Sequence, residues 1–333
     1  MFVRIVFVLV GVAVLFATPA AQAQQSESSG ASKESLNVLF IGNSYTARHN
    51  LANVVEAMAE AGNPGLDFRP TTVIYGGRTL SDHWRLGSAN FVKLHALTNE
   101  EGVATVASLK EAAKDAKDRH SNLALKKHQE LLKTLTSKRS KWDVVVLQSY
   151  RDDLEGSESL YAQFAPKFAE LAHDQDARVI LYVTTPTTQN AEPMEGLPDA
   201  APVMKKTRAI AALANQIDAS VAPMSLVAFK AQTERPDLTL RFVNDAHLNK
   251  TMAYLTACTL YAALFERTPE GLPVDSITDV RYWQRPDKSF DKTKDRDQQP
   301  IKQVFSAKDR ADLQRIAWES YVEFESLRDS KSQ

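Results

Sequence analysis

The sequence predicts an α/β protein built as a three-layer α/β/α sandwich around a central, mostly parallel sheet. Two observations carry this prediction. Short apolar runs rich in β-branched residues alternate along the chain with stretches of helical periodicity, which is the pattern of strands joined by covering helices. The composition, with 44% hydrophobic and 24% charged residues among 333, is that of an ordinary globular protein with a sizeable core.

Five apolar runs are the expected strands. Each is short and is followed by glycine, proline or polar residues, which end a strand. The runs are Leu36–Ile41, Val73–Tyr75, Asp143–Leu147, Arg178–Val183 and Ala219–Ala222. Apolar residues recur with helical spacing in Leu51–Ala61, Tyr161–His173 and Met204–Ile217. Strands separated by helices pair in parallel, with helices on both faces of the sheet.

The first 23 residues predict a secretory signal peptide. Arg4 precedes the apolar run Ile5–Ala17, and Ala21–Ala23 has the small residues of a cleavage site. The run is short for a bilayer span, so no stable membrane insertion is expected after signal cleavage. An uncleaved anchor is the alternative. We expect residues 24–35 to be a flexible mature N-terminus and the protein to be secreted or periplasmic.

The rest of the chain is expected to form one domain, residues 36–270, with two additions. A charged segment at about residues 99–141 predicts an insertion of two amphipathic helices, a cover or spacer to which no binding role is assigned. Residues 271–333 are expected to pack on the same domain as a C-terminal extension that ends in a helix near Lys308–Leu327.

The charge of the chain argues against nucleic acid as a partner, and its single cysteine excludes an intramolecular disulfide. The 40 basic and 41 acidic side chains give a formal net charge of −1, so the chain lacks the positive field that nucleic acid binding requires. The single cysteine, Cys258, cannot form an intramolecular disulfide and lies in an apolar run, as a core residue does. No cofactor and no metal are expected, because Asp245 and His247 lack a third ligand at a telling spacing.

Reactive and polar residues follow the predicted strands one after another. Ser44, Gly77 and Gln148 come after the first three, and the loop Thr184–Asn190 and His247 come after the last two. The carboxyl ends of parallel strands open onto one crevice. The five segments are therefore expected to meet at a single site.

Four segments, in chain order, resemble the sequence blocks of one superfamily. VLFIGNSYT (Val38–Thr46) resembles the nucleophile block of the SGNH hydrolases, also called the GDSL esterase/lipase superfamily. YGGRTL (Tyr75–Leu80) is similar to their glycine block, WDVVVLQ (Trp142–Gln148) to the strand before their third block, and NDAHLN (Asn244–Asn249) to their last block. The resemblance implies a flavodoxin-like SGNH hydrolase fold and ester hydrolysis through a serine acyl-enzyme.

The resemblance also implies a nucleophile and a base. Ser44 would attack after losing its proton to His247, and a carboxylate on the other ring nitrogen would fix the tautomer of the imidazole. The family spacing of three residues before the histidine falls on Asn244, whereas Asp245 stands two before it. We expect Asp245 to be the orienting acid, with a Ser–His dyad as the alternative.

The expected oxyanion hole consists of the backbone N–H groups of Ser44 and Gly77 and the side-chain amide of Gln148. The family uses an asparagine in its third block, but that spacing falls here on Asp152, whose carboxylate would repel an oxyanion. Gln148 carries a neutral donor at the end of its strand and is the expected replacement.

Each assignment has a structural alternative. Ser44 would otherwise be only a helix cap, His247 only the polar start of the next helix, and Gly77 only a turn residue. Arg78 and His83 are the candidate substrate-binding residues, although His83 also suits a helix in the core.

The expected function is that of a secreted serine esterase that hydrolyses an O-acyl group, foremost O-acetyl on a carbohydrate. Its partner would be a small-molecule or polysaccharide ester. The alternatives are a lysophospholipase or thioesterase, and a non-catalytic carbohydrate-binding protein of the same fold.

Overall fold

The computed structural model describes residues 34–135, 139–150, 159–184, 189–243, 245–280 and 291–329. These residues belong to one compact unit that begins at Lys33. The predicted signal peptide and nearly all of the predicted flexible N-terminus lie outside the described residues.

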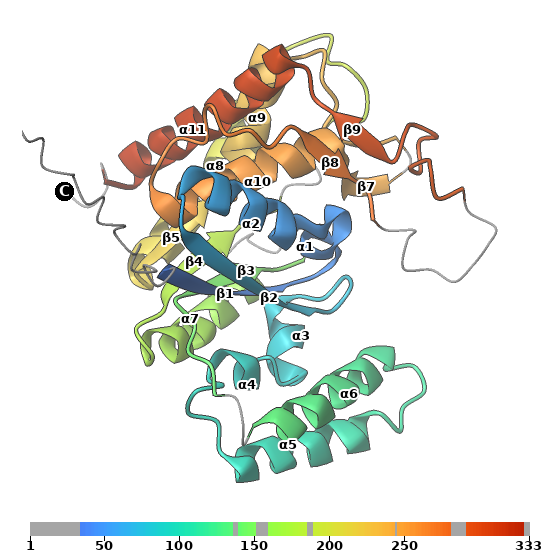
Figure 1. The fold of residues 1–333 in the computed structure, drawn as a ribbon, viewed down its shortest axis with the longest axis vertical. Coiled ribbons are helices and arrows are strands. Elements are labelled where there is room, and N and C mark those ends of the chain that lie inside the picture. Colours follow the sequence, from blue (N-terminus) through green and yellow to red (C-terminus); the bar gives the residue numbers. More distant parts are fainter. Residues whose placement is uncertain are drawn as a thin grey trace, which may run out of the picture. The chain divides into compact units, whose positions relative to one another are not determined.

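A five-stranded parallel sheet forms the centre of this unit, with strand order β2-β1-β3-β4-β5 (Figure 1). The strands are β1 (Glu34–Gly42), β2 (Leu66–Ile74), β3 (Val144–Gln148), β4 (Arg178–Tyr182) and β5 (Ala219–Ala222). The predicted parallel sheet is confirmed. β2 starts seven residues before the predicted run, because its first half is a partly exposed edge without a continuous apolar pattern.

Alternate residues of the strands pack into two separate cores. Val38 and Phe40 of β1 belong to one apolar cluster, and Leu39 and Ile41 belong to the other. Successive side chains of a strand point to opposite faces of the sheet, so both faces are covered. The architecture is the predicted three-layer α/β/α sandwich.

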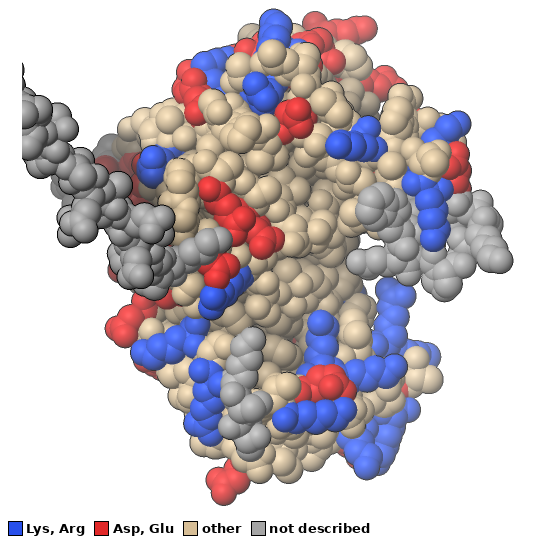
Figure 2. All heavy atoms as spheres, in the orientation of Figure 1, with Lys and Arg blue, Asp and Glu red and all other residues tan. Residues whose placement is uncertain are grey.

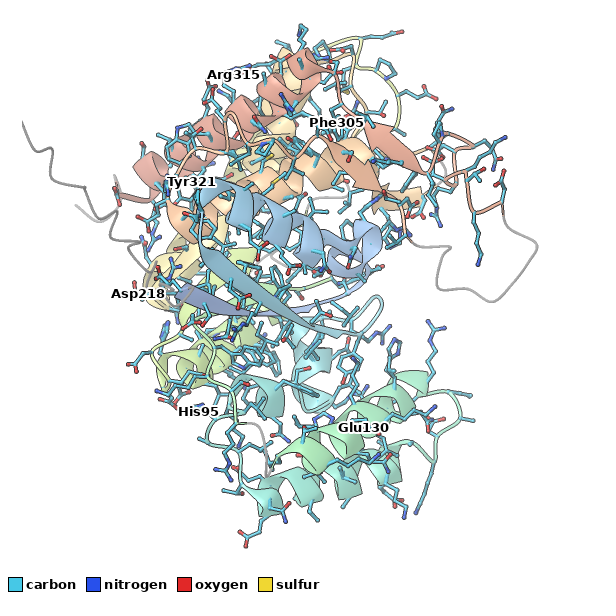
Figure 3. All side chains as sticks on the ribbon, in the orientation of Figure 1. His95, Glu130, Asp218, Phe305, Arg315 and Tyr321 are labelled. Carbon is cyan, nitrogen blue, oxygen red and sulfur yellow. The ribbon has the colours of Figure 1, made fainter. Side chains whose placement is uncertain are left out.

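The first layer contains α2, α9, α10 and α11, which lie above the sheet in Figure 1. Their bounds are α2 (Leu51–Gly62), α9 (Met224–Glu234), α10 (Lys250–Phe265) and α11 (Ala307–Asp329). α10 is buried along almost its whole length and includes the free Cys258. In this layer Phe305 packs against Tyr254, with ring centroids 4.7 Å apart, and Arg315 of α11 donates to Glu234 of α9 (Figure 3).

The second layer contains α3 (Leu80–Arg85), α4 (Ala89–Val92), α7 (Leu160–His173) and α8 (Ala200–Gln216). Beyond it, α5 (Asn99–Ala112) and α6 (Arg119–Thr134) form the predicted pair of insertion helices, at the bottom of Figure 1. Nε2 of His128, in α6, lies 3.0 Å from the carbonyl oxygen of Gly87. Asn90 donates to Thr105 of α5, at 2.8 Å. The insertion is thereby fixed to α3 and α4.

Short elements surround the carboxyl edge of the sheet. They are α1 (Ser44–Ala47), the 3-10 turn η1 (Arg48–Asn50), the antiparallel pair β6 (Arg241–Phe242) and β7 (Asp245–Leu248), and the antiparallel pair β8 (Ser276–Thr278) and β9 (Lys302–Val304). None of the described helices has both the length and the apolar content needed to cross a bilayer.

Candidate active site

The turn after β1 holds Ser44 at the start of a helix. Asn43 caps that helix, because its Oδ1 accepts a hydrogen bond from the N–H of Tyr45 at 3.1 Å. The amide nitrogen of Asn43 donates to the carbonyl oxygens of Arg78, at 3.1 Å, and Ser149, at 3.2 Å. One buried side chain therefore joins the loops that follow β1, β2 and β3.

Gln148, at the end of β3, supports the turn that holds Ser44 and does not line the pocket beside Ser44. Its Oε1 accepts hydrogen bonds from the N–H of Asn43, at 2.8 Å, and from the hydroxyl of Thr46, at 3.2 Å. Its Nε2 donates to the carbonyl of Ser149, and the residue is completely buried. The expectation that Gln148 donates to an oxyanion is wrong for this geometry, because the residue is completely buried and does not line the pocket beside Ser44.

Because Gly42 has no side chain, Gln148 and Thr46 can pack closely against the end of β1. A Cβ at Gly42 would lie 2.5 Å from the hydroxyl oxygen of Thr46 and 2.6 Å from Oε1 of Gln148, which is closer than real Cβ contacts allow. A larger residue would therefore push the turn away from β3.

The predicted nucleophile, base and acid meet at one point. The Oγ of Ser44 lies 2.8 Å from Nε2 of His247. The Nδ1 of His247 lies 2.5 Å from Oδ1 of Asp245, which also accepts the backbone N–H of His247 at 3.0 Å. Ser44, His247 and Asp245 form a Ser–His–Asp triad. Asn244, the alternative position for the acid, lies outside the described residues.

The β6–β7 pair positions the histidine of the triad. His247 lies on β7, a short strand that the sequence analysis did not predict. The hydroxyl of Tyr45 donates to the carbonyl of Ala246, at 2.6 Å, and its ring stacks on the imidazole of His247 with centroids 5.2 Å apart. The residue next to the nucleophile thus also holds the base.

Two arginines face the carboxylate of the triad. Nη1 of Arg48 lies 3.4 Å from Oδ2 of Asp245, and the guanidinium of Arg296 contacts the same oxygen. Both guanidinium groups lie over the ring of Phe242, at 5.4 and 5.5 Å from its centroid. Because Oδ2 faces the arginines, Oδ1 is left for His247, and the carboxylate has one fixed orientation.

His49, next to Arg48, is a buried structural residue. It adopts a left-handed backbone conformation with φ of 62°, and its Nε2 donates to the carbonyl of Leu248 at 3.0 Å. Burial lowers its pKa to about 4. It therefore supports the β7 segment as a neutral imidazole.

Ser44 and Gly77 line the same pocket as His247. In the part of the chain that the structure describes, no backbone hydrogen bond uses the N–H of either residue. Gly77 has a φ of +67°, a conformation that glycine adopts without strain. Free backbone N–H groups of this kind are the donors that an oxyanion hole needs, and the assignment of these two residues to the hole stays a prediction.

His120 of α6 supports the Gly76–Gly77 peptide from outside the pocket. Its Nε2 lies 3.1 Å from the carbonyl oxygen of Gly76, which can only accept, so Nε2 carries the proton. In a trans peptide the C=O and the following N–H point in opposite directions. A bond to the carbonyl of Gly76 therefore fixes the direction of the N–H of Gly77.

The two candidate substrate-binding residues have different positions. Arg78 lines the pocket beside Gly77. His83 is completely buried beneath it, where Nε2 contacts the carbonyl of Gly42 at 3.0 Å and Nδ1 contacts the hydroxyl of Ser88 at 2.8 Å. Burial lowers the pKa of His83 to about 4. The expectation that His83 binds substrate is wrong, because His83 lies on the buried face of α3 and does not line the pocket.

The pocket has a volume of about 410 Å³. It is lined by Ser44, Tyr45, Gly76, Gly77, Arg78, Arg119, Tyr150, Ala246 and His247. Arg119 belongs to the insertion, for which the sequence assigned no binding role. Asp152, the other position considered for an oxyanion residue, lies outside the described residues. Among the described residues, no group of three or more His, Cys, Asp or Glu side chains is arranged to hold a metal ion.

Neither a family model nor a curated protein matches the chain. Among solved structures, it is similar to a DUF4886 family protein from Bacteroides uniformis, with a TM-score of 0.47 and 15% identity, over 87% of this chain and 95% of that chain. A protein from Slackia heliotrinireducens, provisionally assigned to the SGNH hydrolases, matches with a TM-score of 0.39 and 16% identity, over 69% of this chain and 100% of that chain. TesA matches with a TM-score of 0.38 and 13% identity, over 69% of this chain and 98% of that chain.

Proposed function

We propose that the protein is an exported serine esterase of the SGNH type that removes a small acyl group, foremost acetyl, from a carbohydrate ester. One observation carries the proposal. A continuous hydrogen-bonded chain runs from Ser44 through His247 to Asp245, beside two backbone N–H groups that no described residue engages. Acyl transfer through a serine nucleophile uses these parts in this arrangement.

The geometry supports a two-step reaction. His247 Nε2 takes the proton of Ser44 as Oγ attacks the acyl carbon, and the carbonyl oxygen becomes an oxyanion facing the N–H groups of Ser44 and Gly77. The intermediate then breaks its bond to the alcohol, which leaves with the proton from His247. Water enters, loses a proton to His247 and releases the acid from Ser44 by the same route.

The lining of the pocket supports a small acyl group and a polar alcohol. The described lining residues include two tyrosines, two arginines and glycine backbone, and Ala246 is the one aliphatic side chain among them. This wall offers little apolar surface for a long acyl chain. Hydroxyl-rich ligands are suited to arginine donors and to tyrosine rings, which combine an apolar face with a polar end.

Export is the second part of the proposal. It rests on Arg4, the apolar run Ile5–Ala17 and the small residues Ala21–Ala23, and it suits a polysaccharide substrate outside the cell. N-terminal sequencing of exported material should begin near Gln24. Retention of residues 1–23 on the exported protein would contradict this part.

Turnover tests the activity. The wild type should hydrolyse p-nitrophenyl acetate and acetylated xylan, with little turnover of p-nitrophenyl palmitate, and Ser44→Ala should lose turnover of all three. Preference for the palmitate ester, or for an acyl thioester, would replace the proposal with a lipase or thioesterase. A folded wild type that binds xylan and hydrolyses none of these esters would indicate a non-catalytic carbohydrate-binding protein.

A further inference from the structure

The insertion ends at the pocket, and its first turn brings a cation there. Asp118 caps α6 by accepting the N–H of Ser121 at 3.1 Å, and Arg85 of α3 donates to the same carboxylate at 2.8 Å. With His120 bonded to Gly76, these contacts fix the start of α6 against the loop after β2. Arg119, between the two anchored residues, lines the pocket.

Arg119 has no compensating acid among the described residues. No described side chain forms an ion pair or hydrogen bond with it, and the neighbouring Asp118 is occupied by Arg85 and Ser121. Arg119 is exposed at the rim of the pocket, so its positive charge faces the space that substrate would enter.

Arg78 adds a second, weakly compensated cation. Its nearest described carboxylate oxygen, Oδ2 of Asp82, lies 3.9 Å from its Nε, which is too long for a hydrogen bond. The same oxygen already accepts hydrogen bonds from the N–H and hydroxyl of Thr79. The Nε of Arg78 is buried with no hydrogen-bond partner. A buried donor of this kind is satisfied when an acceptor binds beside it.

The described side chains that line the pocket carry positive charge and no negative charge. The described residues that line the pocket include two arginines and no carboxylate, and the carboxylate of Asp245 lies behind His247 against Arg48 and Arg296. Burial and the nearby Arg78 also lower the pKa of His120. Figure 2 shows further Lys and Arg side chains gathered at the end of the α5–α6 pair.

We infer that Arg78 and Arg119 form a subsite for an anionic group, carboxylate, sulfate or phosphate, carried by the alcohol part of the substrate. This inference rests on the proposed function and specifies its substrate as an O-acylated acidic carbohydrate. The small acyl group occupies the space beside Ser44, so the anion belongs to the part of the ester that leaves. Arginine matches the oxygen pairs of all three anions through parallel hydrogen bonds.

Matched aryl acetates test the subsite. 4-Acetoxybenzoate, 4-acetoxybenzenesulfonate and 4-acetoxyphenyl phosphate carry the three anions, and 4-acetoxybenzamide is the neutral control of similar size. The wild type should show kcat/KM at least about tenfold higher for one or more of the anionic esters than for the amide, since hydrogen bonds to charged groups contribute strongly. The ratios among the three anions identify the group. Added salt should reduce the preference, because the charges are near solvent.

Arginine variants locate the preference. Arg119→Ala and Arg78→Ala should each bring the ratio of anionic to neutral kcat/KM toward one. Lys133→Ala removes the same charge from the last turn of α6, at the opposite end of that helix from Arg119, and should leave the ratio as in the wild type. A wild-type ratio near one, or a preference that neither arginine variant reduces, would overturn the inference while leaving ester hydrolysis intact.

A binding measurement separates this inference from the proposed function. On Ser44→Ala, calorimetry should show binding of 4-hydroxybenzoate, 4-hydroxybenzenesulfonate or 4-hydroxyphenyl phosphate that is at least about tenfold tighter than that of 4-hydroxybenzamide and is lost in Arg119→Ala/Ser44→Ala. This result would support the subsite even if the wild type hydrolysed no ester. Equal affinity for anions and amide would overturn the subsite even if the wild type were an active esterase.

Discussion

At the residue scale, the sequence predicted the three residues that meet in the triad but not the side chains that hold them. Ser44, His247 and Asp245 were predicted from their residue types and from a resemblance in sequence, and the structure brings them together. Tyr45 and Arg296 had no such signal. Tyr45 acts through a contact with a residue 201 positions away, which no local pattern encodes.

Gln148 illustrates the same limit. Its position at the end of β3 was predictable, because strand ends follow from apolar runs. The direction of its amide was not, since it depends on the close approach of Gly42 and Thr46 across the sheet.

Gln148→Ala should destabilise the protein more than it slows the reaction. The substitution leaves the buried N–H of Asn43 without an acceptor, which costs about 1–3 kcal/mol of unfolding free energy. The kcat of the folded protein should fall by less than about tenfold, whereas loss of an oxyanion donor costs about 10²–10³. Thermal unfolding and kcat are measured on one preparation.

Gln175→Ala is the matched control for that variant. Gln175 is also buried and accepts the N–H of Trp142, at 3.0 Å, outside the site. Its loss of stability should be similar, with kcat unchanged. Normal stability of Gln148→Ala together with a hundredfold loss of kcat would restore the oxyanion role for Gln148.

Asp245→Asn tests which residue is the acid of the triad. The amide cannot hold the imidazole in the required tautomer, so kcat should fall by about 10³–10⁴, as in other Ser–His–Asp enzymes. Asn244→Ala should lower kcat far less. Single-turnover and steady-state kinetics of the two variants decide the matter, and the opposite order of effects would assign the acid to position 244.

At the scale of elements, the five strands and their covering helices followed from local patterns, and the short pieces around the site did not. The β6–β7 pair is too short to show an alternating pattern, and η1 depends on positive φ values at His49 and Asn50. The insertion was predicted as two solvated helices. Its role as a wall of the pocket comes from tertiary contacts of the first turn of α6, which the balanced charges of the segment do not reveal.

His120→Ala should lower kcat with little change in KM. Without the bond to the carbonyl of Gly76, the N–H of Gly77 loses its fixed direction toward the oxyanion, which forms only during the reaction. We expect a loss of about tenfold, smaller than that for removal of a direct donor. His120→Gln keeps a side-chain N–H donor and should recover most of the rate.

His95→Ala is the control for this variant, because His95 lies between α4 and α5, away from the pocket (Figure 3). Its kcat should equal that of the wild type. If His120→Ala also had wild-type kcat, or if the glutamine variant recovered nothing, the bond to Gly76 would have no part in positioning the oxyanion hole.

At the scale of the whole molecule, the C-terminal region reaches back to the site. The described tail after residue 290 is held by a buried ion pair between Lys250, at the start of α10, and Asp295. The next residue, Arg296, contacts Asp245 of the triad. The sequence predicted that this region packs on the domain, but a contact between segments about 50 residues apart has no signature in a single sequence.

The free energy of unfolding should decrease as the pH is lowered from about 6.5 to about 4. Two buried histidines set this range. His49 and His83 have folded-state pKa values lowered by burial to about 4, below the unfolded value of 6.5. In this range the unfolded chain binds more protons than the folded one, so acid favours unfolding. Each histidine contributes up to about 3 kcal/mol of pH-dependent stability.

Urea unfolding at several pH values measures this dependence. His83→Gln should be less stable at pH 7 and should show a shallower decline toward pH 4, since one of the two groups is gone. His173→Gln changes an exposed histidine and should keep the wild-type slope. A stability that stayed level from pH 7 to pH 4 in the wild type would contradict the neutral, buried state of these imidazoles.

The most direct test of the account is covalent labelling of the nucleophile. The wild type is treated with a fluorophosphonate, which reacts with an activated serine and leaves its phosphonyl group on Oγ, and the product is digested and analysed by mass spectrometry. We predict one phosphonyl group, on the peptide that contains Ser44, with none on Ser44→Ala and much slower labelling of His247→Ala. No adduct on the folded wild type, or an adduct on another residue that persists in Ser44→Ala, would contradict the assignment of Ser44 as the nucleophile.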